Sequence, residues 1–307
     1  MIKKRIIIIL IFFLFTGINN SFSKDPGFEF LRTELGARPA GLAGAFVAVD
    51  GDLNGLFYNP AGLASIPEKV GTFTYINHLM DINAGVVGYA HPLAKKGVIA
   101  VGIHYFNYGD FEGKDTQGND TGVFGANDFS MTLSYSLQVK DNTKAGVSGK
   151  FINSNIENYS ARAFAIDLGV IHTIEKHKLN IGLSLINIGS ATKGFIETKE
   201  SLPSQIKAGI SKELAHLPIM LSAEIRRFSD NNFQYAGGGE ISLHKKVKAR
   251  LGYNSEGQDQ HFGITDDSYA GFSFGLGLEW SKFILDYSIS SMGGIGNLNR
   301  FTITRTF

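Results

Sequence analysis

Apolar and polar residues alternate with a period of two over most of the chain beyond residue 70, and this pattern constrains the fold more than any other feature. From Phe129 to Val139 every second residue is apolar, with serine, threonine or glutamine between. Successive side chains of a strand point to opposite faces, so such a segment has one apolar and one polar face. Segments 164–170, 179–185 and 272–280 repeat the pattern. We predict fourteen strands, at 70–78, 82–91, 97–108, 127–139, 143–153, 161–174, 179–187, 204–213, 219–228, 233–243, 247–254, 270–280, 283–290 and 299–307.

The links between these strands alternate in length, apart from two short ones at 78–82 and 228–233. Transmembrane β-barrels have short periplasmic turns and longer outer loops, and about 9–11 tilted residues of each strand cross the bilayer. A soluble β-sandwich is the alternative, but it rarely needs fourteen strands with one continuous apolar face. We therefore predict an all-β fold, a 14-stranded antiparallel transmembrane β-barrel over residues 70–307. Short links fall at 91–97, 139–143, 174–179, 213–219, 243–247 and 280–283, and mostly long ones at 108–127, 153–161, 187–204, 254–270 and 290–299.

The N-terminus has the pattern of a secretory signal peptide. Lys3, Lys4 and Arg5 precede ten apolar residues, and Ser21-Phe22-Ser23 follows. A membrane anchor is the alternative, but ten residues are too few to span a bilayer. We predict a signal peptide over residues 1–23, cleaved after Ser23.

Net charge and cysteine content exclude some classes of function and of stabilising bond. Removing the three charges of the leader leaves 26 positive against 28 negative side chains, so no basic excess points to nucleic acid. The chain has no cysteine, which excludes disulfides and a lipid-modified N-terminal cysteine. An exported protein of this kind depends on one large folded unit for its stability.

Residues 24–69 differ from the rest, because they hold four of the seven prolines and a run rich in glycine and alanine. Asp52 is predicted to cap a short helix over 53–57, which Asn59 ends because it precedes a proline. A barrel of fourteen strands is too wide for wall side chains alone to fill. The inward charges suit either an open porin or a barrel closed by this segment, which we expect to form an N-terminal hatch inside the lumen. The inward positions are His104, Lys150, Asp167, Lys207, Glu224, Arg226, Glu240, Lys248, Arg250, Glu279 and Asp286.

Two motifs resemble known functional sites but lack a residue or a structural context that those sites need. Residues 50–55 match the start of a calcium-binding EF-hand loop, but Ala61 stands where the bidentate glutamate belongs. Gly271-Phe272-Ser273-Phe274-Gly275 matches a nucleophile elbow, yet it lies inside an alternating strand rather than at a strand-to-helix turn. We predict no enzyme activity, no catalytic residue, no metal site and no cofactor. Asp110, Glu112, Asp115, Asn119 and Asp120 are interpreted as a solvated outer loop.

Both ends of the chain carry recognisable motifs. The first end holds Gly36-Ala37-Arg38, the run from Gly41 to Val49, Asp52 and the Asn59-Pro60-Ala61-Gly62-Leu63 core. The other end holds Leu285-Asp286-Tyr287-Ser288 followed by the stretch from Gly296 to Phe301. These motifs resemble the PorV/PorQ family of outer-membrane proteins, distant relatives of the FadL transporters. A terminal strand that closes on Phe307 also resembles the insertion signal of outer-membrane barrels. The motif residues predicted to form the hatch are Gly36, Arg38, Gly41, Gly44, Asp52, Asn59, Pro60, Ala61 and Gly62.

The resemblance implies a barrel in the bacterial outer membrane, with membrane lipid as a partner. PorV-like members hold the C-terminal signal domain of exported cargo in the type IX secretion system, and PorQ-like members support surface attachment. We therefore expect an accessory of type IX secretion, with secretion components or exported proteins as partners. FadL-like transport of hydrophobic small molecules is the alternative. It would use an apolar pocket between hatch and wall, for which Leu42, Phe46, Phe57 and Tyr58 are the candidates.

Overall fold

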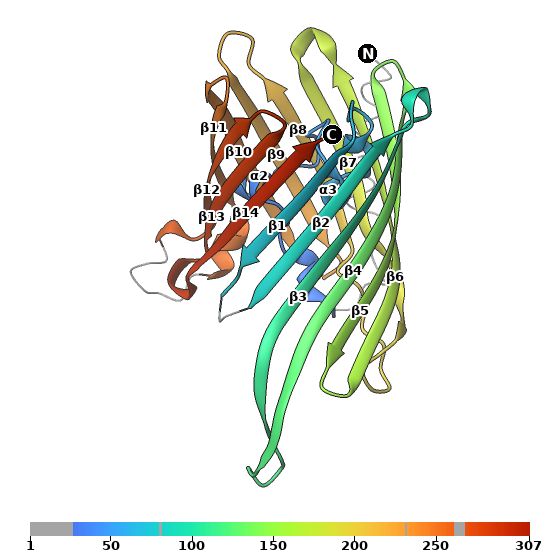
Figure 1. Ribbon diagram of the computed structural model, residues 1–307, viewed down its shortest axis with the longest axis vertical. Coiled ribbons are helices and arrows are strands. Elements are labelled where there is room, and N and C mark those ends of the chain that lie inside the picture. The colour runs from blue at the N-terminus through green and yellow to red at the C-terminus, as the bar shows by residue number, and fades with distance from the viewer. Residues whose placement is uncertain (1–26, 80–81, 231, 261–267) are drawn as a thin grey trace.

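A computed structural model of the chain describes residues 27–79, 82–230, 232–260 and 268–307. The predicted signal peptide over 1–23 lies outside the described residues. Fourteen antiparallel strands pair in sequence order, and β1 closes the cylinder by pairing with β14 (Figure 1). The predicted fold class is confirmed. The strands are β1 Val70–Asn77, β2 Asn83–Pro92, β3 Val98–Lys114, β4 Asp120–Lys140, β5 Thr143–Ile156, β6 Tyr159–Ile174, β7 Leu179–Lys193, β8 Gln205–Glu213, β9 Ile219–Phe228, β10 Phe233–His244, β11 Val247–Asn254, β12 Phe272–Trp280, β13 Phe283–Ser291 and β14 Asn297–Thr306.

Alternation along the strands separates the two faces of the wall. On β4, Leu133 is 57% exposed while its neighbours Thr132 and Ser134 are buried. Large apolar side chains thus cover the outside, which meets lipid, and small polar ones face the lumen. Closure of the cylinder pairs every strand, so no sheet edge is left in the bilayer. Within the described ranges, no helix is long and apolar enough to cross a membrane.

Several strands are longer than the alternation predicts. The segment 108–127, expected as a loop, instead extends β3 to Lys114 and begins β4 at Asp120. Likewise β5 runs to Ile156 and β6 starts at Tyr159. These extensions lie beyond the lipid-facing band, where both faces meet water, so the sequence loses its alternation while the ladder continues. The β3–β4 hairpin consequently projects far from the barrel (Figure 1).

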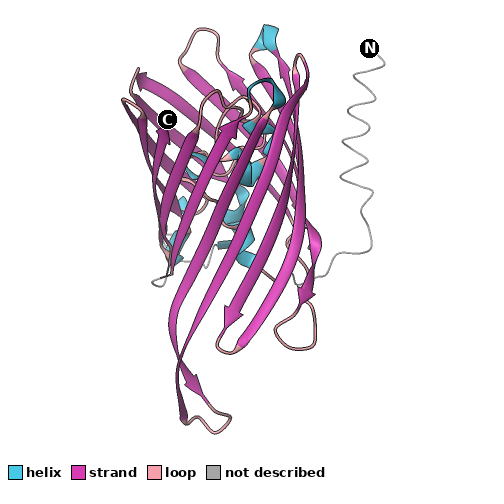
Figure 2. Ribbon diagram, turned by 45° about the vertical axis from the view of Figure 1, so that its right-hand side comes forward, coloured by secondary structure: helices cyan, strands magenta, loops and turns pink. Residues whose placement is uncertain are grey.

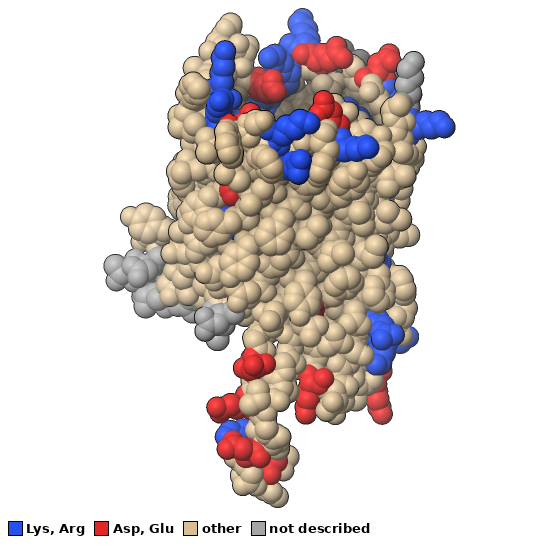
Figure 3. All heavy atoms as spheres, viewed as in Figure 1, with Lys and Arg blue, Asp and Glu red and all other residues tan. Residues whose placement is uncertain are grey.

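The two ends of the barrel differ in charge and in connections. The end where the chain terminates carries the short turns, and we call it the short-turn end. Lys and Arg gather at its rim on the face seen in Figure 3. The opposite, long-loop end carries the projecting β3–β4 hairpin, on which Asp and Glu gather. In transmembrane barrels the longer connections face outward.

The N-terminal segment, residues 27–69, runs inside the cylinder (Figure 2). It contains η1 Glu29–Arg32, α2 Ala37–Gly41, α3 Gly55–Tyr58 and η2 Pro60–Leu63. Helix α2 packs against β11 to β14, and η2 packs against β4, β5 and β6 on the opposite wall. The segment therefore spans the lumen from wall to wall. The remaining short helices, η3 Ala94–Lys96, η4 Glu175–His177, η5 Ser255–Gln260 and η7 Gly293–Ile295, lie in links between strands.

The helix predicted at 53–57 begins two residues later, as α3. The Asp52 carboxylate accepts hydrogen bonds from the backbone N–H and the side-chain amide of Asn54, both at 2.7 Å. It thus closes a turn before the helix rather than capping the helix itself. The chain leaves α3 at Asn59 in an extended conformation, with φ −160° and ψ 106°, as expected before Pro60.

Candidate functional site

The inner wall is built from glycine where the N-terminal segment touches it. A methyl group added at Gly252 would lie 2.5 Å from the carbonyl carbon of Leu42, and one at Gly146 would overlap the backbone of Pro60. Real Cβ atoms do not approach other atoms so closely, so only glycine fits at these two positions. The segment is therefore seated backbone against backbone, with little room for adjustment.

The glycines of the predicted hatch motif serve the same close fit. Gly36 and Gly44 adopt left-handed backbone conformations, with φ of 84° and 81°, which favour glycine. A methyl group at Gly41 would lie 3.2 Å from the Cα atom of Gly275 in β12. One at Gly62 would lie 2.7 Å from the Val49 carbonyl oxygen, within the segment itself.

Asn59 fastens the segment to itself. Its side chain is fully buried, and its amide nitrogen donates to the Val47 carbonyl oxygen at 2.6 Å. Its side-chain oxygen accepts a hydrogen bond from the Ala61 N–H at 3.1 Å and so begins η2. Pro60 at the first position of η2 suits a helix start, because its missing N–H would be unpaired there anyway. The Asn59-Pro60-Ala61-Gly62 motif thus forms a rigid corner.

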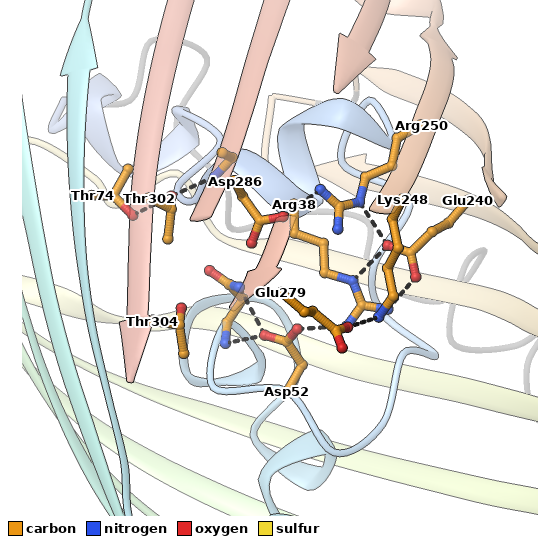
Figure 4. A network of polar contacts seen from close by, with 12 residues as sticks. Arg38, Asp52, Thr74, Glu240, Lys248, Arg250, Glu279, Asp286, Thr302 and Thr304 are labelled. Carbon is orange, nitrogen blue, oxygen red and sulfur yellow. Dashed lines mark hydrogen bonds and ion pairs between the residues drawn. The ribbon is translucent and has the colours of Figure 1, made fainter. Parts of the chain in front are cut away.

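A cluster of ion pairs joins helix α2 to the wall (Figure 4). The guanidinium of Arg38 donates to both carboxylate oxygens of Glu240 on β10, at 2.9 and 2.8 Å, and to Asp52 at 2.7 Å. Arg250 on β11 donates to Glu240 and to Asp286 on β13, both at 2.6 Å. Two guanidiniums therefore bridge three carboxylates, and we call these five residues the Arg38 cluster.

The position of Arg38 favours its charged form despite its burial. Burial alone would lower the pKa of the guanidinium, but the carboxylates of Glu240 and Asp52 outweigh it and raise the pKa of Arg38 above its ordinary value. Bidentate pairing with a carboxylate is the strongest arrangement that arginine offers. The cluster therefore holds α2 by charge-assisted bonds to the wall.

A second cluster holds the middle of the segment. Glu224 on β9 accepts hydrogen bonds from the backbone N–H groups of Phe46 and Val47, at 3.1 and 2.9 Å. Arg226 lies 3.4 Å from both Glu224 and Glu34, and Lys207 on β8 lies 3.6 Å from Glu224. These wall charges thus contact the N-terminal segment directly.

The other predicted inward charges pair along the wall. Lys150 on β5 lies 2.8 Å from Asp167 on β6 and donates to the Asn187 side chain at 2.7 Å. Lys248 and Glu279 form a 2.7 Å pair whose side chains remain 29% and 37% exposed. The Lys248–Glu279 pair is thus partly solvated, whereas Lys150 and Asp167 are buried.

The four apolar candidates Leu42, Phe46, Phe57 and Tyr58 lie in the N-terminal segment. Leu42, Phe46 and Tyr58 are at most 4% exposed and pack in one cluster, against which Phe57 rests. The rings of Phe46 and Tyr58 lie 5.4 Å apart. Their side chains fill the space by contacting one another, and ligand binding among them stays a prediction.

Cavities lie on either side of the segment. One of about 190 Å³ opens at the short-turn end beside Arg38, Asp52 and Lys248. Another, of about 240 Å³, lies toward the long-loop end beside Glu34, His78 and Arg300. Partial burial and the nearby Arg300 both lower the pKa of His78, so its imidazole is neutral near pH 7. Within the described ranges, no group of three or more His, Asp or Glu side chains is placed to hold a metal ion.

A larger cavity lies at the long-loop end, and we call it the outer groove. It measures about 600 Å³ and is lined mostly by apolar side chains of the β3–β4 hairpin, the β5–β6 turn and the β7–β8 link. Phe111 and Phe124 stack across the hairpin with ring centroids 5.6 Å apart. The remaining lining residues are Tyr108, Ala126, Asp128, Asn155, Ile156, Tyr159, Phe195 and Ile196.

Sequence reasoning missed the outer groove because 108–127 was interpreted as a polar loop. Of the acidic residues named there, Asp110, Glu112 and Asp120 are exposed and Asp115 is partly exposed, but Phe111 and Phe124 of the same stretch face the groove. A usable signal was present, since Phe111 and Phe124 are apolar residues in a polar, glycine-rich stretch. Phe307, predicted as the insertion signal, directly follows β14, is 53% exposed and donates from its N–H to the Lys69 carbonyl oxygen at 2.9 Å.

Solved structures share this fold at low sequence identity. The Ralstonia pickettii toluene transporter TbuX matches with a TM-score of 0.58 and 14% identity, over 89% of this chain and 98% of that one. The CymD monoaromatic hydrocarbon channel matches with a TM-score of 0.62 and 13% identity, over 89% and 97%. A Pseudomonas aeruginosa FadL homologue matches with a TM-score of 0.57 and 11% identity, over 88% and 98%. No curated protein sequence matches the chain.

The sequence itself matches one protein family. The model of the family described as "Type IX secretion system protein PorV" matches residues 24–177, which is half of the chain. The match covers the N-terminal segment and strands β1 to β6, and so includes both the Arg38 motif and the hairpin of the outer groove. The fold and the match together show that this outer-membrane β-barrel belongs to the PorV family.

Proposed function

We propose that this barrel is a non-enzymatic accessory of type IX secretion that binds exported polypeptides or secretion components at the outer face. The observation that carries this proposal is the outer groove, an apolar cavity of about 600 Å³ beyond the lipid-facing band. Exposed apolar surface outside a membrane has no lipid to cover it, so it marks an interaction site. Membership of the PorV family supports secretion as its context.

We further propose that residues 24–69 act as a hatch that closes the lumen. The Arg38 cluster and the Glu224 contacts hold the segment from two sides, and glycines in the wall admit its backbone closely. Removing one partner from such a buried pair is costly, so the closed arrangement is favoured at rest. A closed lumen favours work at the outer surface over conduction through the barrel.

Deleting the gene tests the secretion role. Exported proteins should then accumulate inside the cell or in the medium rather than on the surface, and wild-type protein should restore display. A Phe124→Ser variant should restore display poorly, because Phe124 lines the groove. Val139→Ser is the matched control, since Val139 is 50% exposed, lies at the other end of β4 and is not among the groove residues. Unchanged display in the deletion strain would refute the proposal.

Transport of hydrophobic small molecules is the second candidate. Tyr108 and Phe195 line the outer groove and also pack against an apolar cluster in the outer part of the barrel that includes Phe28, Phe30 and Phe106. Apolar surface therefore continues from the groove inward. This candidate predicts that the deletion strain loses growth on a hydrophobic carbon source while surface display stays intact.

A further inference from the structure

The β3–β4 hairpin continues as a two-stranded ribbon after its neighbours in the wall have ended. The β2–β3 ladder ends at the pair Asn83 and Asn107, and the β4–β5 ladder begins only at Ala126 and Ile156. The β3–β4 ladder itself runs on to Lys114 and Asp120. No strand of the described chain therefore pairs with the outer edge of β4 at residues 120–124.

An unpaired edge is a template for another strand. Its N–H and C=O groups point sideways and pair readily with an added extended chain. Proteins use this mode for peptide recognition, in which backbone hydrogen bonds give affinity and pockets for alternate side chains give specificity. The ribbon stands beyond the lipid-facing band, where water and soluble chains reach it.

The open edge of β4 borders the outer groove. The groove continues from Phe111 and Phe124 on the ribbon to Ile156 and Tyr159, which flank the β5–β6 turn beside that edge. A strand added along the edge would follow the line of β5 outward, above this turn. Every second side chain of that strand would then point into the groove, because strand side chains alternate between faces.

The negative charge of the ribbon favours a positively charged partner. Residues 108–125 carry Asp110, Glu112, Asp115 and Asp120 against the single cation Lys114, a net charge of −3. Asp110, Glu112 and Asp120 are exposed and Asp115 is partly exposed, and they leave the apolar groove with an acidic rim. Complementary charge steers an approaching partner and rejects one of like charge.

We propose that an extended, cationic segment of an exported polypeptide adds as a strand to the β4 edge at residues 120–124 and buries its alternate apolar side chains in the outer groove. This inference rests on the proposed function and names the form in which the partner binds. The edge supplies the backbone hydrogen bonds, the groove takes the side chains, and the acidic rim sets the charge.

Synthetic peptides test the edge pairing with the purified full-length protein in zwitterionic detergent. The probe is a short peptide of alternating valine and lysine. A second peptide has the same side chains but N-methyl groups on alternate backbone amides, so that one edge cannot donate hydrogen bonds. We expect the methylated peptide to bind at least about tenfold more weakly, because each lost hydrogen bond is worth roughly 1 kcal/mol. A valine–glutamate peptide should bind more weakly still.

Protein variants complete the test. Phe124→Ser should weaken binding of the valine–lysine peptide about tenfold or more by removing the groove side chain. Val139→Ser, which changes an exposed side chain at the other end of β4, should leave binding unchanged. Equal binding of the methylated and unmethylated peptides would overturn the proposal, since only side-chain capture would then operate. Absence of binding to the wild type would overturn it too. If gene deletion impairs surface display and yet methylation has no effect, only the edge pairing fails. If deletion leaves display intact, the proposed function fails as well.

Discussion

Replacing Arg38 with methionine is expected to loosen the N-terminal segment while leaving the barrel folded. Methionine keeps the length of the side chain but removes the only cation within hydrogen-bond distance of Asp52 in the Arg38 cluster. Glu240 loses its bidentate partner and retains Arg250 at 2.6 Å. The cluster then holds three carboxylates against one guanidinium.

The size of the effect follows from the burial of these groups. Breaking a buried ion pair by removing one partner costs about 3–5 kcal/mol. The Arg38 side chain is 22% exposed and Glu240 keeps one cation, so we take the lower end, about 3 kcal/mol. Because 1.4 kcal/mol is a tenfold change, the open population of the segment should rise more than about 100-fold.

Hydrogen exchange measures this opening directly. Amides of residues 37–63 should exchange more than about 100-fold faster in Arg38→Met than in the wild type, while amides of the barrel strands keep their protection. Lys248→Met is the matched control, because it removes a pair at the same end whose side chains are 29% and 37% exposed. That pair is worth only about 0–1 kcal/mol. Equal protection of residues 37–63 in wild type and Arg38→Met would refute the role assigned to the cluster.

Three further changes test the close fit of the N-terminal segment at Gly146, the Arg32–Asp230 ion pair and the role of Phe307. Gly146→Ala should destabilise the seating of the N-terminal segment by about 1–3 kcal/mol in hydrogen exchange, whereas Gly149→Ala, whose added methyl meets nothing within 4 Å, should be nearly silent. Burial raises the pKa of Asp230, but the 2.7 Å bond from Arg32 and a backbone N–H outweigh it and hold that pKa below its ordinary 3.8. The Arg32–Asp230 pair therefore stabilises the fold above about pH 4 and is lost as the pH falls further. Acid should thus lower the protection factors of the amides of residues 29–32, which are corrected for the intrinsic pH dependence of exchange, in the wild type and change them less in Asp230→Asn. Deleting Phe307 should lower the amount of barrel assembled in the outer membrane, measured by heat-modifiable gel mobility, and unchanged assembly would contradict its role as an insertion signal.

The barrel could be predicted from the sequence because each strand carries its own pattern of alternating apolar and polar residues. Each crossing strand must place apolar side chains toward lipid and small or polar ones inward, so segments such as 129–139 carry the whole signal within a few residues. Beyond the lipid this requirement ends, and strands β3 and β4 continue without alternation. The ribbon and its groove were missed for that reason.

The partners within the lumen could not be predicted from the sequence. Alternation places Glu240 and Arg250 on the inward face, but it does not say that both meet across the Arg38 cluster. Arg38 and Glu240 are 202 residues apart, and their contact depends on how the segment threads the closed cylinder. The sequence identified the residue types, and the three-dimensional arrangement supplied the pairs.

Electrical conductance in a planar lipid bilayer tests the central claim, that the N-terminal segment closes the lumen, most directly. The wild-type protein should insert without producing stable open-channel current steps, because the segment spans the lumen and is held from both sides. Arg38→Met should show intermittent openings on the same background. Steady ohmic current through the wild type would contradict the account, since it would require an open pore where the structure places the segment.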